Sequence, residues 1–181
     1  ATTLIDTSKS AYVLATATYR ARPLTVVHLV RDPRAVAYSN LRSKTDPAQG
    51  GAVHLAPRPV WKSALQWGLA NLRTERVLHR MVGVRRLHTF ARLRYEAVTL
   101  APDASLAPLV TAIEAPTGRS SVPRGHAVAG NPVLFEEAPI TPDDRWAAAM
   151  TSKQNVVVAA IAWPLMTRYG YRLDPTRPRR S

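Results

Sequence analysis

The sequence contains no cysteine, which excludes disulfides and thiolate metal sites and leaves the redox compartment undetermined. Its five histidines are scattered without the spacing of metal ligands, so we expect no metal site. No apolar run approaches the length of a membrane span, and no amino-terminal segment has the layout of a signal peptide. These absences favour a cytoplasmic protein with no membrane partner.

Acidic and aromatic residues are scarce. Twelve Asp and Glu stand against 25 Lys and Arg, which gives a formal net charge of +13, and aromatic residues make up 7% of the chain. This charge suits a nucleic-acid-binding protein, but it equally suits an enzyme whose substrates are anionic. The basic residues are spread along the chain, with a tight cluster only at Arg177, Arg179 and Arg180. With so few aromatics, a base-stacking platform is not expected, and nucleic acid is the least favoured partner.

The length and the apolar content of the chain are those of an ordinary globular protein. At 181 residues and 46% apolar content, the chain is long enough to bury one core, and no composition shift indicates a second domain. We therefore expect a single domain over residues 1–171. The polar, Pro- and Arg-rich residues 172–181 are predicted to form a flexible basic tail.

The stretch 24–41 reads LTVVHLVRDPRAVAYSNL and has the strongest local pattern. Its apolar run 24–30 predicts a strand that is buried on both faces of a parallel sheet. Asp32 can then cap a helix whose first position is Pro33. Such a turn would gather free backbone N–H groups and the Arg31 guanidinium at the carboxyl end of a strand, and Ser39 could add a hydroxyl donor. The alternative is an ordinary strand-to-helix turn with a solvated arginine.

Other elements follow from periodicity and from helix signals. A long helix is predicted over 60–82, with one buried stripe formed by Trp61, Leu65, Gly68, Leu69, Leu72, Leu78 and Met81. Residues 43–59 are predicted to form a Pro- and Gly-rich loop, 87–95 a strand and 105–115 a helix. Asp143 is predicted to cap a further helix. A last helix is predicted over 153–168, with an interruption at Pro164 and a stop at Gly170.

The central stretch resembles a known family. HLVRDPRAVAYSNLR is similar to the 3′-phosphate-binding segment of sulfotransferases, which use 3′-phosphoadenosine 5′-phosphosulfate as sulfuryl donor. In that family an Arg ends the strand, and a Ser eight residues later lies on the following helix. The resemblance implies that Arg31 and Ser39 hold the 3′-phosphate of the donor.

Three further segments carry the same resemblance in the expected order. LIDTSKSAY resembles the stretch that directs a Lys at the transferred group, which implies a catalytic role for Lys9. RLRYEAV is similar to the segment whose Tyr packs by the adenine ring, which implies that role for Tyr95. GHAVAGNPVLFEEAPI resembles the nucleotide-covering loop of the bacterial members, which implies that Gly130 and Asn131 contact the nucleotide.

The resemblance implies an α/β fold, a P-loop-like parallel sheet flanked by helices. Because no glycine precedes Gly50, we expect the sulfotransferase fold without its first strand and its 5′-phosphosulfate loop. The chain also departs from the family where Leu134 and the pair Glu136 and Glu137 stand in place of basic residues. Carboxylates near a 3′-phosphate would repel it.

The implied reaction moves a sulfuryl group from the donor to a hydroxyl or amine of a small-molecule or glycan acceptor, with no metal. The catalytic base stays open between Asp6 and His126. One alternative is a catalytically silent, truncated sulfotransferase-like binding protein. The other is a basic nucleic-acid-binding domain.

Overall fold

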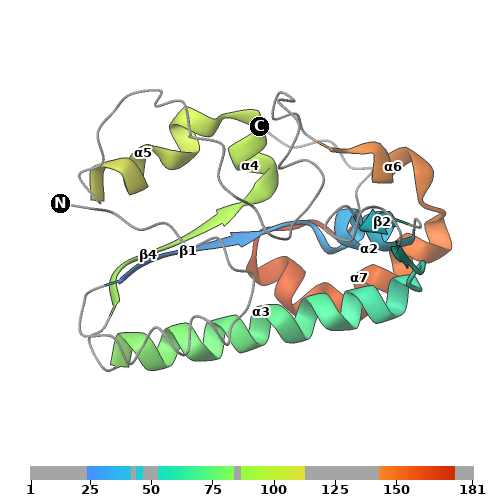
Figure 1. The fold of residues 1–181 in the computed structure, drawn as a ribbon, viewed down its shortest axis with the longest axis horizontal. Helices are drawn as coiled ribbons and strands as arrows, with labels where there is room; N and C mark the ends of the chain where they lie inside the picture. The colour runs from blue at the N-terminus through green and yellow to red at the C-terminus, as the bar shows by residue number, and fades with distance from the viewer. Residues whose placement is uncertain (1–23, 42–43, 47–52, 84–86, 113–142, 174–181) are drawn as a thin grey trace.

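The computed structural model describes residues 24–41, 44–46, 53–83, 87–112 and 143–173 (Figure 1). Within them the chain forms a mixed α/β structure that is mostly helical. In chain order the elements are β1 (Leu24–Val30), α2 (Pro33–Leu41), β2 (Lys44–Asp46), β3 (Val53–Leu55), α3 (Val60–Gly83), β4 (Leu87–Arg94), α4 (Tyr95–Leu100), α5 (Pro102–Ala112), α6 (Arg145–Ala149) and α7 (Ser152–Arg168).

The central pair of strands is parallel, as the sequence predicts. β1 lies beside β4, with Val26 opposite Phe90 and Val30 opposite Arg94. In Figure 1, α3 and α7 lie below the two strands, and α4 and α5 lie above them. Because the strands are parallel, both carboxyl ends reach the same edge, where Arg31 follows β1 and Tyr95 follows β4.

The prediction that β1 is buried on both faces is wrong. His28 and Val30 are buried, whereas Val27 and Leu29 are about half exposed. Alternate side chains of a strand point to opposite faces, so one face of β1 packs against the core and the other is only partly covered. The apolar run therefore indicates the strand correctly but overstates its burial.

The predicted buried stripe of α3 is also wrong in part, although its bounds are confirmed within a residue. Trp61, Leu65 and Leu69 lie on the outside. The face that packs inward is formed by Ser63, Ala64, Trp67, Asn71, Glu75, Leu78 and Met81. Three of these residues are polar, so a prediction based on apolar residues alone assigns the exposed Trp61, Leu65 and Leu69 to the buried face.

The core lies between β1, α2, α3 and α7. Its larger cluster contains Val30, Trp67, Ala162, Leu165, Met166, Tyr169 and Tyr171. A second cluster, formed by Ala37, Ala64, Met150 and Val158, joins α2 and α3 to α7. Side chains from distant parts of the chain thus converge beneath the strand pair.

Both ends of α7 are marked by capping structures. Thr151 accepts the backbone N–H of Gln154 and the Gln154 side chain bonds back, which forms a capping box. Contrary to prediction, the helix continues through Pro164. It stops at Gly170, whose φ of 75° lets the N–H of Tyr171 reach the carbonyl of Met166 at 2.8 Å. This turn places Tyr171 in the core.

Two smaller predictions also need correction. The expected loop over 43–59 includes an antiparallel strand pair, in which Thr45 lies opposite His54. The helix expected over 105–115 is α5, which begins three residues earlier at Pro102, a residue suited to the first helical position. Within the described ranges, no helix has both the length and the apolar content needed to cross a membrane.

Candidate functional site

The carboxyl edge of the strand pair brings together two residues that separate motifs single out. The guanidinium of Arg31 lies over the ring of Tyr95, with its central carbon 4.9 Å from the ring centroid. Arg31 immediately follows β1, and Tyr95 opens α4 directly after β4. A cation over an aromatic face is a favourable contact, and it helps to position the guanidinium.

The polar edge of Arg31 is only partly satisfied. Its Nη2 donates to Oδ2 of Asp143 at 3.0 Å, and the two side chains are 27% and 23% exposed. Its Nε is buried and has no hydrogen-bond partner among the described residues. The backbone carbonyl of Arg31 accepts a hydrogen bond from the indole Nε1 of Trp67 at 2.9 Å. The main chain is therefore anchored to α3, while the guanidinium retains capacity to bind an anion.

Asp143 does not cap a helix, contrary to prediction. The N-cap position of α6 is Asp144, which makes no capping hydrogen bond with its side chain. Asp143 instead accepts from Arg145 Nε at 2.8 Å and from Arg31. The hydrogen bond from Arg145, together with the positive charges of Arg145 and Arg31, lowers the pKa of Asp143 to about 2. Asp143 is thus a carboxylate at neutral pH and occupies the side of Arg31 that could receive an anion.

The first turn of α2 differs from the expected cluster of free N–H groups. The N–H of Asp32 donates to Glu96 Oε1 at 2.9 Å, and the N–H of Arg34 donates to Asp32 Oδ1 at 2.8 Å. Asp32 is therefore the predicted cap, but the two carboxylates already satisfy these donors. Any anion that binds here must rely on side chains more than on these two amides.

Arg34 is a structural residue that the sequence prediction missed. Its Nε and Nη2 bind Asp32 at 3.0 and 2.7 Å, and its Nη1 donates to the carbonyl of Leu173 at 3.2 Å. The guanidinium also lies over the ring of Trp146, 4.6 Å from its centroid. This side chain thus ties the start of α2 to α6 and to the segment after α7. The only signal for this role in the sequence is that Asp32 and Arg34, which have opposite charges, lie one residue apart just after the strand.

Glu96 connects the same edge to the carboxyl-terminal segment. Besides the amide of Asp32, it meets the hydroxyl of Tyr171 at 2.8 Å, and that hydroxyl lies 2.9 Å from the carbonyl of Val30. A hydroxyl has one hydrogen, so it donates to one of these oxygens at a time. Burial, and then the negative charge of Glu96, raise the pKa of Tyr171. Tyr171 therefore stays neutral, and its hydroxyl contacts the last residue of β1.

The Trp67 and Asn71 pair forms a buried support beneath the edge. The Asn71 side chain donates to the carbonyl of Trp67 at 2.8 Å, and its Oδ1 lies 2.9 Å from His28 Nε2. With the amide in this orientation, Nε2 of His28 is the donor. Burial lowers the pKa of His28, and its ring packs edge-on against Tyr169, with the ring centroids 6.0 Å apart. His28 is accordingly a neutral core residue.

The other predicted site residues have different outcomes. Ser39 lies in α2 and is partly buried. Lys9, Gly130 and Asn131 lie outside the described residues, as do the two candidate bases, Asp6 and His126. No group of three possible metal ligands occurs in the part of the chain that the structure describes.

Comparisons with protein-family models, curated proteins and solved structures find no match for this chain. The sulfotransferase resemblance therefore stays a prediction from the sequence motifs. The arrangement at the strand edge is suited to recognition of an anion beside an aromatic ring, because it joins a partly satisfied guanidinium to a tyrosine.

Proposed function

We propose that the protein binds 3′-phosphoadenosine 5′-phosphosulfate and transfers its sulfuryl group to a hydroxyl or amine of a small-molecule or glycan acceptor. The observation that carries this proposal is the contact between Arg31 and Tyr95. The motifs that contain them lie far apart in the sequence, and the resemblance assigns one to the 3′-phosphate and the other to the adenine. Their contact at one sheet edge supports a common nucleotide site in a P-loop-like sulfotransferase fold.

The chemistry of Arg31 suits a phosphate. In the proposed complex the guanidinium stays on the ring of Tyr95 and exchanges the carboxylate of Asp143 for the 3′-phosphate. A phosphate has more acceptor oxygens than a carboxylate and can engage the buried Nε as well as Nη2. Ser39 would add a hydroxyl donor from α2. The hydrogen bond from Trp67 holds the Arg31 main chain during this exchange.

The proposed reaction is an in-line displacement. The acceptor oxygen or nitrogen forms a bond to sulfur while the bond from sulfur to the bridging phosphate oxygen breaks, and that oxygen keeps the electron pair. The acceptor proton passes to a base, for which Asp6 and His126 stay the candidates. By resemblance, Lys9 neutralises charge on the transferred group, and Gly130 and Asn131 cover the nucleotide.

A catalytically silent binding protein is the second candidate, and a specific observation favours it. Three carboxylates, those of Asp32, Glu96 and Asp143, already occupy the amides and the guanidinium at the strand edge. Their negative charge opposes a second anion. Such a protein would bind the nucleotide without transferring the sulfuryl group.

Calorimetric titration of 3′-phosphoadenosine 5′-phosphate tests the nucleotide site. We expect saturable binding to the unaltered protein and at least about tenfold weaker binding to Arg31→Ala, because the main phosphate contact is removed. Arg73→Ala, which removes an exposed arginine from α3, is the matched control and should bind normally. Equal heats with the unaltered protein and Arg31→Ala would overturn the site. Transfer of labelled sulfate to an acceptor panel then separates the enzyme from the silent protein.

A further inference from the structure

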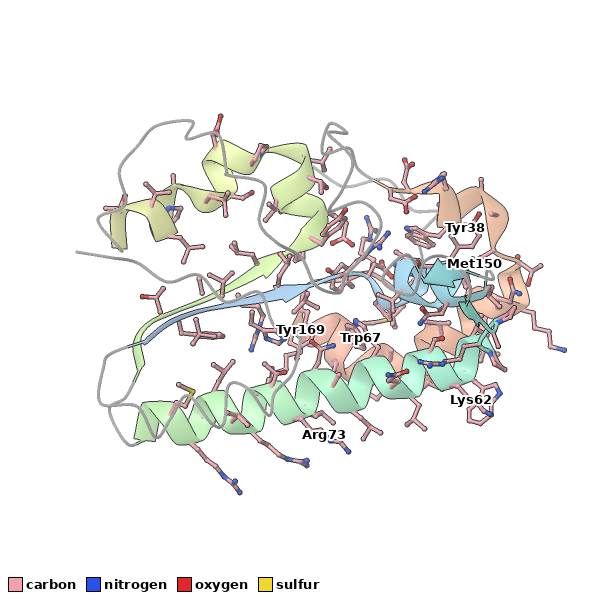
Figure 2. The ribbon with its side chains drawn as sticks, in the orientation of Figure 1. Tyr38, Lys62, Trp67, Arg73, Met150 and Tyr169 are labelled. Atoms are coloured by element: carbon pink, nitrogen blue, oxygen red, sulfur yellow. The ribbon has the colours of Figure 1, made fainter. Side chains whose placement is uncertain are left out.

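The outer side of α3 carries apolar side chains at helical spacing. Trp61, Leu65 and Leu69 lie one turn apart and are 48%, 48% and 44% exposed. With Lys62 and Arg73 they line a shallow hollow of about 350 Å³. Figure 2 shows Lys62 and Arg73 pointing away from the strands, on the opposite side of α3 from Trp67. Three large apolar side chains in a row are more than the isolated exposed residues expected on a surface.

The same row continues as a line of cations. After Leu69, positions one helical turn apart hold Arg73, Arg76 and Arg80, all exposed. The only acidic residue of α3 is Glu75, which is buried and pairs with Arg92 and Arg168 at 2.8 and 3.0 Å. We call the row Trp61, Leu65, Leu69, Arg73, Arg76 and Arg80 the outer stripe. It is apolar in its first half and cationic in its second.

The charge order of the outer stripe disfavours a second copy of this chain as the occupant. If two copies of α3 packed antiparallel, the arginines of each would lie against the apolar half of the other. If they packed parallel, arginine would face arginine. Either arrangement desolvates cations without a carboxylate partner, in a protein whose net charge is already +13.

The charge order of the outer stripe also favours a linear partner over a lipid surface. The apolar and cationic halves follow one another along the helix axis, an order that a second helix can match residue by residue. Charge complementarity requires that helix to be acidic where the stripe is cationic.

We propose that the outer stripe of α3 is the docking site for an acidic amphipathic helix of a partner protein. The apolar side chains of the partner helix fill the hollow beside Trp61, Leu65 and Leu69. Its Asp or Glu residues, spaced one turn apart, pair with Arg73, Arg76 and Arg80. This interaction uses the face of α3 opposite the buried Trp67 and Asn71, so it is independent of the nucleotide site.

A stapled synthetic helix, with leucines on one face of its first half and glutamates on the same face of its second half, tests the proposal. Fluorescence anisotropy of the labelled peptide against the full chain should show saturable binding. Leu65→Glu and Arg76→Glu should each weaken it by about tenfold or more, since they place a like charge or an unpaired polar group in the contact. Both residues are exposed, so the fold, checked by circular dichroism, should be unchanged.

Two controls make the result decisive. Val156→Glu, which alters an exposed apolar residue of α7, should leave peptide binding unchanged. A peptide with lysines in place of the glutamates should not bind. Absence of saturable binding, or equal loss in all three variants, overturns the proposal. Two other results overturn it as well. Self-association that Leu65→Glu abolishes would assign the stripe to a second copy of the chain. Tighter binding to phosphatidylserine vesicles than to the peptide would assign it to a lipid surface.

Discussion

Two arginines near the carboxyl edge of β1 each bind an aspartate, yet their surroundings differ. Arg34 and Asp32 have side chains that are 3% and 6% exposed and are joined by two hydrogen bonds, at 2.7 and 3.0 Å. Arg31 and Asp143 are 27% and 23% exposed and share a single hydrogen bond at 3.0 Å. The first pair is closed to solvent, and the second is partly open.

The difference separates a structural pair from the pair at the proposed nucleotide site. Breaking the buried pair leaves a charge in a medium where water cannot compensate it. A partly exposed pair is stabilised much less, because water competes for both partners. In the proposed complex Arg31 therefore releases Asp143 for a phosphate, whereas Arg34 cannot leave Asp32 without destabilising α2. Two arginines three residues apart in the sequence thus have different roles.

The largest effect is expected when the buried pair is broken. Arg34→Ala should lower the free energy of unfolding by about 3–5 kcal/mol, because Asp32 is left buried without its partner. Arg31→Ala should lower it by about 1 kcal/mol or less. Chemical denaturation of both variants measures the contrast. Equal losses of stability would remove the distinction between the two arginines.

Acidification tests the buried His28 of β1. Burial holds the pKa of His28 below its ordinary value of 6.5, so the unfolded chain takes up the proton more readily. The stabilisation from neutral His28 is complete above pH 6.5 and is lost as the pH falls below 6.5 towards the folded-state pKa. We expect His28→Gln to flatten this part of a pH series of denaturation midpoints. An unchanged slope would assign the pH dependence to other groups.

A smaller effect is expected from opening the exposed pair. Asp143→Asn keeps the size of the side chain but removes the negative charge that competes for Arg31. We expect affinity for 3′-phosphoadenosine 5′-phosphate to rise a few-fold, about 1 kcal/mol. Asp103→Asn, which removes the charge of an exposed aspartate in α5, is the matched control. Weaker binding to Asp143→Asn than to the control would show that Asp143 supports the site instead of competing with the ligand.

The smallest effect concerns the titration of Asp143 itself. Its pKa is lowered from 3.8 to about 2, so its stabilising contribution is present above pH 3.8 and is lost as the pH falls through about 2. NMR detection of the carboxyl carbon should show this low midpoint. Arg145→Ala, which removes the hydrogen bond that lowers this pKa most, should raise the midpoint towards 3.8. A midpoint near 3.8 in the unaltered protein would mean that the contacts of Asp143 are not maintained in solution.

Local signals in the sequence predicted much of the fold. The turn from β1 into α2, with Asp32 as cap and Pro33 at the first position, is confirmed, as are α3, the parallel alignment of β4 and the stop at Gly170. These features depend on periodicity, capping and backbone conformation over a few residues. The contact between Arg31 and Tyr95 was not predicted, because the family resemblance implied only that the two residues bind different parts of one nucleotide.

The features that the sequence did not predict depend on contacts across the chain. The burial of Asn71 and Glu75 depends on partners from β1, β4 and α7, so the inner face of α3 could not be located from its own residues. Arg31 follows the strand and Arg34 lies inside α2, but the partners that bury Arg34, the ring of Trp146 and the carbonyl of Leu173, come from the other end of the chain. Likewise, the contact of Asp143 with Arg31 joins residues too distant for any spacing rule.

The most direct test of the central claim, that Arg31 binds a 3′-phosphate, compares the binding of two nucleotides. Titration calorimetry with 3′-phosphoadenosine 5′-phosphate and with adenosine 5′-phosphate measures how much affinity the 3′-phosphate adds. In the unaltered protein we predict a preference for the bisphosphate of about tenfold or more, which Arg31→Ala should abolish. The same preference in Arg31→Ala, or none in the unaltered protein, would contradict the claim.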